Sequence, residues 1–207
     1  TISNDPISQR DINKVLELTQ GIALPPDRDI LHTIPQEFIV DTLEKIDNPI
    51  GLSGRRLEGH VHLVTASTSG MENLIESAEE LGININGLVF KPLASAIPTL
   101  TKDEMKLGVS LIDIGSTTTS IAVFNEGAVR HSAVIPVGSS SITNDIAVML
   151  RISIEEAEKI KIKYASAKAS LSSQKLEFEI PNSEDNQMIS ENELSQYVEA
   201  RMEEIFQ

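Results

Sequence analysis

The sequence contains neither cysteine nor tryptophan, and aromatic residues make up only 3% of it. Without cysteine, a disulfide, a thiolate metal site and a cysteine nucleophile are all excluded. Apolar residues still account for 40% of the chain, which is enough for a core built from Ile, Leu, Val and Ala. This composition is compatible with a reducing cytoplasm, which is the location that we expect.

Basic residues are also scarce, with 17 Lys and Arg against 31 Asp and Glu and a net charge of −14. An acidic chain repels nucleic-acid phosphates and anionic membrane surfaces, so we expect no nucleic-acid partner. The polar N-terminal stretch TISNDPISQRD lacks the pattern of a signal peptide. No apolar run approaches the roughly 20 residues that a membrane-spanning helix needs.

The first third of the chain predicts a small α+β unit, in which a helix over 9–20 precedes two extended stretches, 30–40 and 57–67. The connector DNPIGLSGR between the stretches is rich in turn formers. A second capped helix is expected from Ser69 and a short buried strand at Gly87–Phe90. A short helix is expected after Pro92.

The apolar run Leu107–Ile114 predicts a strand covered on both faces. A hairpin with its turn at 125–127 and a helix after Gly138 follow. The remaining expected elements are a helix over 153–164, a strand over 176–180, a loop over 181–187 and a final helix from Ser190.

The segment with chemical potential is the turn after this strand, where Asp113 precedes Gly115, Ser116, Thr117 and Thr118. Backbone N–H groups and hydroxyls in such a turn can surround phosphate oxygens. The carboxylate would repel phosphate unless it held Mg²⁺ through water, and the helix start after Gly138 offers a second anion site. Asp and Gly also end many strands and Ser and Thr fill many turns, so this segment alone is more typical of an ordinary turn than of a phosphate site.

Several blocks resemble a known family. Strand-DIG-turn-hairpin is similar to the second phosphate loop of the superfamily of actin, sugar kinases and heat-shock ATPases, and KPLASAIPTL resembles its connecting helix. The block HTIPQEFIVDTLEKIDNPIGLSGRRLEGHVHLVTAS resembles the insertion that is specific to FtsA, a bacterial cell-division family. PVGSSSITNDIAVML and EEAEKIKIKYASA also resemble FtsA, so the likeness covers about 6–167.

The resemblance implies an α/β chain, α+β in its first subdomain, with an incomplete actin-like (ribonuclease-H-like) fold and an inserted SHS2-type subdomain called 1C. By this match, residues 1–60 form the 1C-like unit and 61–105 the returning part of subdomain 1A. Residues 106–151 form subdomain 2A, and 152–207 begin subdomain 2B. The family's first phosphate loop, its Gly-rich adenosine motif and its membrane-binding helix are expected outside this chain.

The resemblance also implies site residues. Asp113 and residues 115–118 would face the phosphates and Mg²⁺ of ATP, and Glu158 with Lys161 would face the adenosine; the alternative for this pair is a solvated charged helix face. The family pattern is near DIGGGTTD, whereas this chain reads DIGSTTTS. Ser116 and Thr117 therefore stand where glycines allow close approach. Ser120 stands where a carboxylate is usual, and Lys91 where relatives often carry an acidic residue. These departures predict weak or absent ATP binding by this chain.

The implied function is that of a protein that self-associates into filaments, acts with other divisome proteins and links FtsZ to the membrane at the division septum. The exposed connector supplies Ile50 and Leu52 as predicted contact residues, or as residues folded back onto the sheet. The alternatives are an ATP-using enzyme of the same superfamily and a pilus-assembly relative. His60 and His62 share one strand face and could hold a metal, but no carboxylate partner is evident in the sequence.

Overall fold

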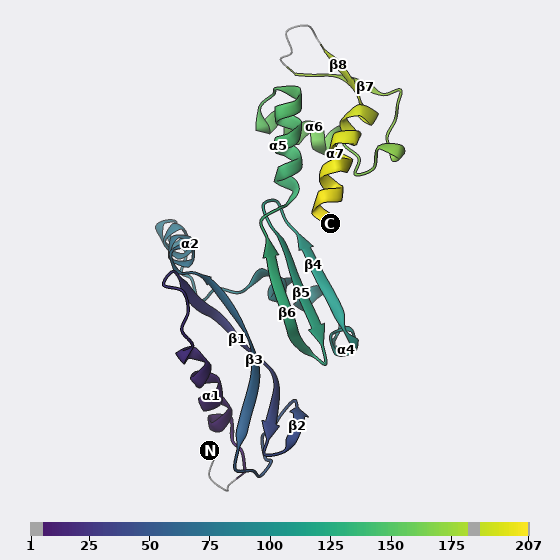
Figure 1. Cartoon of the computed structure of the whole chain (residues 1–207). Helices are drawn as coiled ribbons and strands as arrows, with labels where there is room; N and C mark the ends of the chain where they lie inside the picture. The colour runs from purple at the N-terminus through teal and green to yellow at the C-terminus, as the bar shows by residue number, and fades with distance from the viewer. Residues whose placement is uncertain (1–5, 182–186, 207) are drawn as a thin grey trace. The chain divides into compact units, whose positions relative to one another are not determined.

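The computed structural model describes residues 6–181 and 187–206 and divides the chain into two compact units. The first unit holds the described residues up to Asp113 together with Ser120–Ala133, and the second holds Ile114–Thr119 and the residues from Val134 onward. Figure 1 shows the course of the chain through both units. Within the described residues, no helix is both long and apolar enough to cross a membrane.

The first unit begins with the predicted α+β arrangement. Helix α1 (Gln9–Leu18) opens with the Ser8–Asp11 capping box and continues into the short 3₁₀ turn η1 (Thr19–Gly21). It lies along an antiparallel sheet of order β2-β1-β3 (Figure 1). The strands are β1 (Arg28–Val40), β2 (Leu43–Ile46) and β3 (Leu57–Ser67). The core between helix and sheet consists of buried apolar side chains, namely Ile7, Ile12, Phe38, Val40 and Leu57.

The segment after this sheet differs from the prediction. Helix α2 (Thr68–Glu80) begins earlier than expected, because Ser67 rather than Ser69 accepts the capping hydrogen bond, from the Gly70 N–H. The strand predicted at Gly87–Phe90 is wrong, since these residues have no regular structure and Val89 is 63% exposed. The backbone N–H of Phe90 donates to a histidine side chain, Nε2 of His32 at 2.9 Å, instead of to a neighbouring strand.

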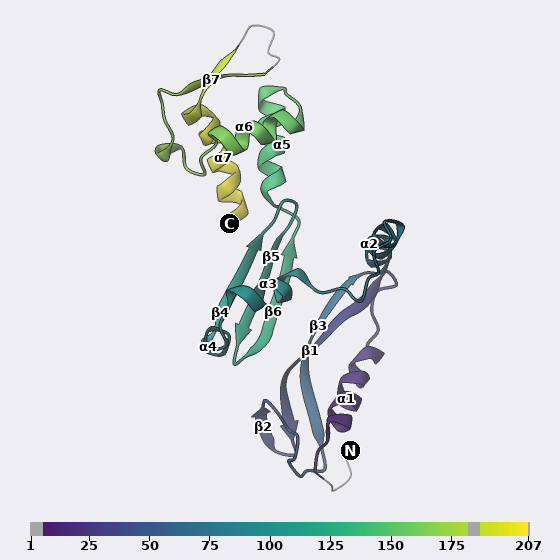
Figure 2. The same cartoon turned by 180° about the vertical axis from the view of Figure 1, so that it is seen from behind.

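A second sheet of order β4-β5-β6 completes the first unit. Its strands are β4 (Val109–Ile114), β5 (Thr119–Asn125) and β6 (Ala128–Ile135), preceded by α3 (Lys91–Thr99) and α4 (Lys102–Leu107). Figure 2 shows α3 lying across one face of this sheet. The predicted β5–β6 hairpin is confirmed: its two-residue turn places Glu126 and Gly127 at φ of 53° and 79°, as a type I′ turn requires.

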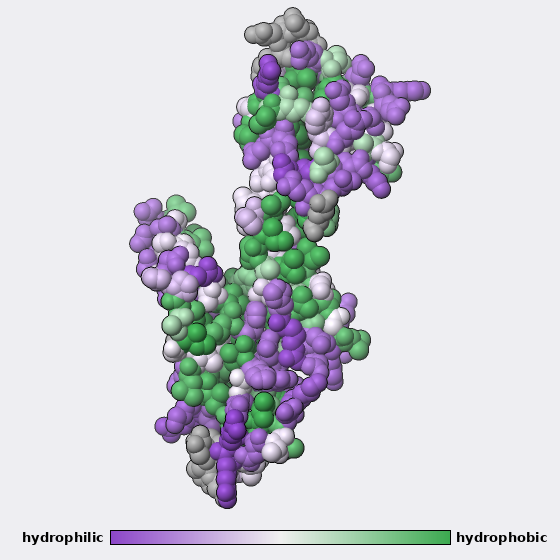
Figure 3. Space-filling view, viewed as in Figure 1, coloured by the Kyte–Doolittle hydropathy of each residue, from purple (hydrophilic) through white to green (hydrophobic). Residues whose placement is uncertain are grey.

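Strand β4 is covered on one face only, which corrects the prediction of a strand buried on both. Its residues alternate between half-buried and exposed, and Ile112 and Ile114 are 54% and 43% exposed. On the covered face, Val109 and Leu111 of β4 pack against the cluster that contains Ala96 of α3. Apolar side chains also gather on the molecular surface over this sheet (Figure 3).

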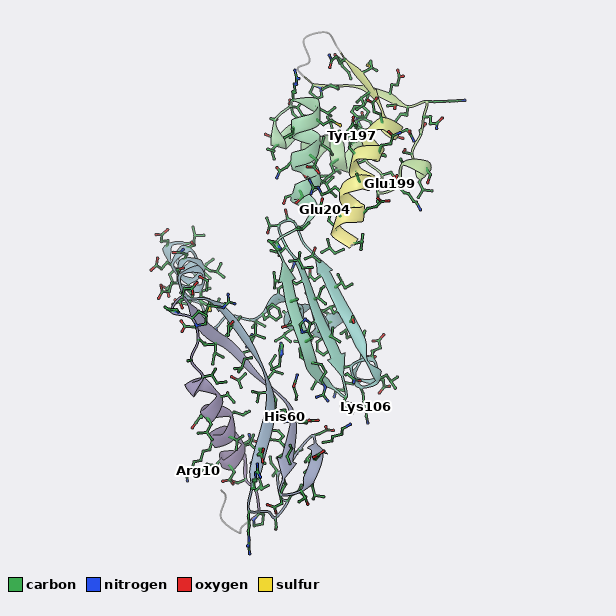
Figure 4. The ribbon with its side chains drawn as sticks, in the orientation of Figure 1. Arg10, His60, Lys106, Tyr197, Glu199 and Glu204 are labelled. Carbon is green, nitrogen blue, oxygen red and sulfur yellow. The ribbon has the colours of Figure 1, made fainter. Side chains whose placement is uncertain are left out.

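The second unit is a helical layer beside a small hairpin. Helices α5 (Ser139–Leu150), α6 (Ile154–Tyr164) and α7 (Glu191–Phe206) pack around Ile146 and Leu194, both 0% exposed. The hairpin strands are β7 (Glu177–Glu179) and β8 (Met188–Ser190), and η2 (Ala169–Leu171) is a short 3₁₀ turn. Glu199, labelled on α7 in Figure 4, accepts a hydrogen bond from the N–H of Ala169. The loop predicted over 181–187 lies largely outside the described residues.

Candidate functional site

The turn between β4 and β5 is fastened to the start of α5, all within the second unit. The Gly115 N–H donates to the Thr118 carbonyl at 2.9 Å, which closes the turn. The first N–H groups of α5 then bond the turn: Ser139 donates to the Gly115 carbonyl at 3.0 Å and Ser140 to the Ser116 carbonyl at 2.8 Å. The Ser140 hydroxyl donates to the same carbonyl at 2.7 Å. These N–H groups therefore hold the turn in place and do not form the separate anion site that the sequence predicts.

Gly138 is required at this junction because of close packing. A Cβ atom there would lie 2.4 Å from the Ser116 carbonyl oxygen and 2.5 Å from that of Gly115. Its φ of −161° is extended backbone, which any residue adopts, so the requirement is for space and not for an unusual conformation. Gly138 consequently sets the distance between turn and helix; a direct contact with a nucleotide remains a prediction.

Glu158 and Lys161 of α6 are joined through a residue of α5. The Thr143 hydroxyl donates to Glu158 Oε2 at 2.5 Å and accepts from Lys161 Nζ at 2.8 Å. Lys161 Nζ also lies 2.6 Å from Glu158 Oε2. The hydrogen bonds from Lys161 and Thr143 hold the pKa of the Glu158 carboxyl below its usual value. The pair predicted from the sequence is thus a fixed network rather than a loosely solvated helix face.

A pocket of about 640 Å³ opens at this network. Its lining brings together the turn, the start of α5 and one face of α6, through Ser116, Ser140, Thr143, Asn144, Ile154, Glu155, Glu158 and Lys159. Ser116 from the predicted phosphate turn and Glu158 from the predicted adenosine contact therefore face one cavity. The Ser116 hydroxyl and the Asn144 side-chain amide suit an anionic group, Glu158 can accept hydrogen bonds from ligand hydroxyls, and the half-exposed Ile154 offers an apolar surface.

Several pocket residues were missed by the sequence reasoning, namely Ser140, Asn144, Ile154, Glu155, Lys159 and Thr143. Thr143 is the most buried of them. It is 3% exposed and occupies the inward face of α5 beside Ile142 and Ile146. The signal that could have identified it is a polar residue on an otherwise apolar helix face, because a buried hydroxyl needs a hydrogen-bond partner. The other turn residues are less enclosed: Thr117 is exposed, and Thr118 is half-buried.

Asp113, in the first unit, is held by α3. Lys91 Nζ lies 2.7 Å from its Oδ1, and the Ser95 hydroxyl donates to its Oδ2 at 2.8 Å. These two hydrogen bonds hold the pKa of Asp113 below its usual range. Both oxygens are thus engaged by the chain, and no group of three or more His, Cys, Asp or Glu side chains suited to a metal occurs in the described residues. This donor set does not fit the magnesium ion expected at Asp113.

The two histidines of β3 do not converge on a metal. His60 Nδ1 lies 2.8 Å from Glu37 Oε1, so the structure supplies a carboxylate partner from β1 that the sequence did not reveal. His62 Nε2 is hydrogen-bonded to the Ser132 hydroxyl at 2.7 Å, and partial burial, with the charge of His131, lowers its pKa. Figure 4 labels His60 on its strand. Each imidazole is used separately within the first unit.

The predicted contact residues Ile50 and Leu52 lie on a fixed connector. Backbone hydrogen bonds join Gly51 and Leu52 to Ile7, at 2.9 and 2.8 Å. Pro49 is buried beneath them, while Ile50 remains 47% and Leu52 38% exposed. The chain therefore presents two apolar side chains from an ordered loop, and neither is folded into the core.

Two protein-family models match the sequence. The model described as "Cell division protein FtsA" matches residues 110–199, and the one described as "SHS2 domain inserted in FTSA" matches 1–65. Curated relatives include cell division protein FtsA of Pseudomonas aeruginosa, 40% identical over 99% of this chain and 50% of the relative. FtsA of Escherichia coli K12 is 36% identical over 87% of this chain and 43% of the relative. The chain thus spans about half the length of the curated relatives it matches.

Solved structures show the same fold at low sequence identity. MreB5 of Spiroplasma citri bound to AMPPNP matches with a TM-score of 0.53 and 20% identity, over 68% of this chain and 45% of that one. The PilM–PilN type IV pilus biogenesis complex matches with a TM-score of 0.55 and 18% identity, over 77% of this chain and 45% of that one. These likenesses show that the fold is actin-like.

Proposed function

Because the chain belongs to the FtsA family of cell-division proteins, we propose that it is part of an actin-like protein that binds ATP and self-associates at the bacterial division septum. The observation that carries the nucleotide half of this proposal is the single pocket that Ser116 and Glu158 share. In the complete protein, FtsZ and other divisome proteins are the proposed partners. Attachment to the inner face of the membrane is proposed to occur through a terminal helix of the complete protein.

The pocket supports a specific division of work among its residues. The Ser116 hydroxyl donates to phosphate oxygens, while Glu158 accepts from the ribose hydroxyls. Hydrogen bonds from Lys161 and Thr143 keep the Glu158 carboxylate charged, so that it can accept hydrogen bonds from the ligand. The purine lies against the apolar side chain of Ile154. An actin-like neighbour, MreB5, has been solved bound to AMPPNP and to ADP, which supports a nucleotide as the ligand class.

Binding rather than rapid hydrolysis is the role that the residues favour. Ser116 and Thr117 carry side chains in the turn where glycines would let phosphate approach the backbone most closely. Lys91 forms an ion pair with Asp113, the carboxylate that directly precedes the turn in the sequence, so this carboxylate is not free to assist hydrolysis. We therefore propose weak nucleotide binding by this chain, and a parent protein that works through contacts. The SHS2 match over residues 1–65 favours this reading over a phosphotransferase or a pilus-assembly protein.

The test is an NMR chemical-shift titration with ATP, because this method measures weak affinities. The wild-type chain should bind with a dissociation constant weaker than a few micromolar, less favourable than about −8 kcal/mol. The largest shifts should fall at Ser116, Ser140 and Thr143. Glu158→Gln and Lys161→Gln should each weaken binding about tenfold, about 1.4 kcal/mol.

Lys163→Gln is the matched control, since Lys163 is on the same helix and does not line the pocket. It should leave the affinity unchanged. Shifts that cluster elsewhere, or an affinity that neither pocket variant alters, would rule out this nucleotide site.

A further inference from the structure

The first two turns of α3 hold Asp113 between two donors. Lys91 is the first residue of α3 and Ser95 follows one turn later, so both project from one face of the helix. Lys91 Nζ takes one carboxylate oxygen at 2.7 Å and the Ser95 hydroxyl takes the other at 2.8 Å. The carboxylate is 18% exposed, whereas the Lys91 side chain is 53% exposed.

This arrangement is imposed by the packing of α3. Pro92 is fully buried and Ala96 is 2% exposed, so α3 is fixed on the β4-β5-β6 sheet through residues that alternate with the two donors. Lys91 and Ser95 therefore meet Asp113 without the help of a ligand.

The position of Lys91 is unusual on electrostatic grounds. The N-terminus of a helix carries partial positive charge, which favours anions and disfavours a lysine at the first position. Asp113 offsets this unfavourable interaction, because its negative carboxylate lies beside the Lys91 ammonium and accepts a hydrogen bond from Ser95 of the same helix. The Lys91–Asp113 pair has no net charge, and the described residues near it form no cluster of carboxylates that would attract a divalent cation.

We propose that the Lys91 ammonium is a built-in counterion that takes the place of a divalent cation at Asp113, so that Asp113 binds a metal ion only when Lys91 is removed. Both carboxylate oxygens are engaged within the first unit, one by Lys91 and the other by Ser95. A divalent cation would have to displace the ammonium or bind beside its like charge. This inference concerns the metal ion expected at Asp113 and does not depend on nucleotide binding.

The test is a metal titration and needs no nucleotide. Mn²⁺ broadens NMR signals near the point where it binds, so it is titrated into the wild-type chain and into Lys91→Gln, which frees Asp113. Wild type should show no more broadening at the Ser95 and Ile114 amides than at other acidic surface positions. Lys91→Gln should gain broadening there, and the double variant Lys91→Gln with Asp113→Asn should lose it again. Lys91→Arg should behave as wild type, because it keeps the charge.

The matched control is Lys102→Gln, which removes a lysine from the first position of the neighbouring helix α4. It should leave the Mn²⁺ response unchanged, and circular dichroism should show that every variant is folded. Local broadening in wild type at Ser95 and Ile114, or no gain in Lys91→Gln, would overturn the counterion role.

Discussion

At the scale of single residues, Thr143 is the side chain on which the Glu158–Lys161 pair depends. It is buried and uses its hydroxyl both as donor to Glu158 and as acceptor from Lys161. Thr143→Val has nearly the same shape but leaves both partners without this contact. We expect the pKa of Glu158 to rise toward its usual value of 4.5, though not fully, because Lys161 remains. Thr143→Ser should retain the lowered pKa, measured by ¹³C NMR of the Glu158 carboxyl.

The same substitution has a pH-dependent effect on stability. The pKa of Glu158 is lowered by folding, so its stabilising contribution is complete above 4.5 and is lost as pH falls through the lowered value. Thr143→Val should therefore cost about 1 kcal/mol at pH 7, and less in strong acid, where the Glu158 carboxyl is protonated. Urea denaturation at the two pH values measures the difference. A cost that does not change with pH would assign Thr143 a packing role alone.

The sequence predicted some residues of the site and missed others for a physical reason. Glu158 and Lys161 were singled out through the resemblance to FtsA, since their spacing on one helix is by itself also typical of a solvated charged face. Thr143 was not, because its contacts depend on how α5 packs against α6. The pairing of Lys91 with Asp113 likewise depends on the packing of α3 on its sheet, although both residues were singled out individually.

At the scale of elements, the join between the turn and α5 is the feature most sensitive to change. Gly138→Ala would place a methyl group against the carbonyl oxygens of Gly115 and Ser116. The helix would have to move away from the turn, at an expected cost of about 1–3 kcal/mol. Because Ser116 and Ser140 line the pocket, ATP binding should also weaken. Urea denaturation and the NMR titration measure the two effects.

Gly87→Ala is the control for this substitution. Nothing lies within 4 Å of a Cβ atom at Gly87, so its stability should stay within about 0.5 kcal/mol of wild type. An equal effect of the two substitutions would show that space at Gly138 is not limiting.

Long, strongly patterned elements were predicted from the sequence, and short or context-dependent ones were not. Strand β3 and helices α5 and α6 match their predicted ranges closely. Strand β2 was missed because it has only four residues. Asp41 just before it and Lys45 within it are non-glycine residues at positive φ, which carry no turn signal in the sequence. Helix α4 was missed because it has six residues, and its Thr101–Glu104 capping box was not followed by a long apolar pattern.

At the scale of the whole molecule, the order of blocks along the chain was enough to predict the actin-like fold. Sequence could not reveal which faces remain uncovered, because coverage depends on elements distant in the chain. Strand β4 illustrates this point: its continuous apolar run predicted burial on both faces, whereas Ile112 and Ile114 remain exposed on one. The division into subdomains at residues 60, 105 and 151 remains a prediction.

The connector surface of Ile50 and Leu52 gives the prediction that belongs to the assembled protein. Both side chains are substantially exposed on an ordered loop that hydrogen bonds to Ile7 hold in place. Exposed apolar side chains on a fixed backbone suit a contact with another subunit, because little conformational entropy is lost on association. We expect Ile50→Asp with Leu52→Asp to abolish self-association of the complete protein in sedimentation velocity, since each carboxylate would be desolvated at the contact.

Leu74→Asp supplies the control, because Leu74 of α2 is 60% exposed and lies outside the connector. It should leave self-association intact. Circular dichroism separates the two explanations for a loss, since a contact role predicts unchanged folding in the double variant. Self-association that survives in a folded double variant would remove the connector from the interface. Unfolding would instead mean that both side chains stabilise the SHS2-like sheet, in which case exposure alone would be a poor guide to contacts in this family.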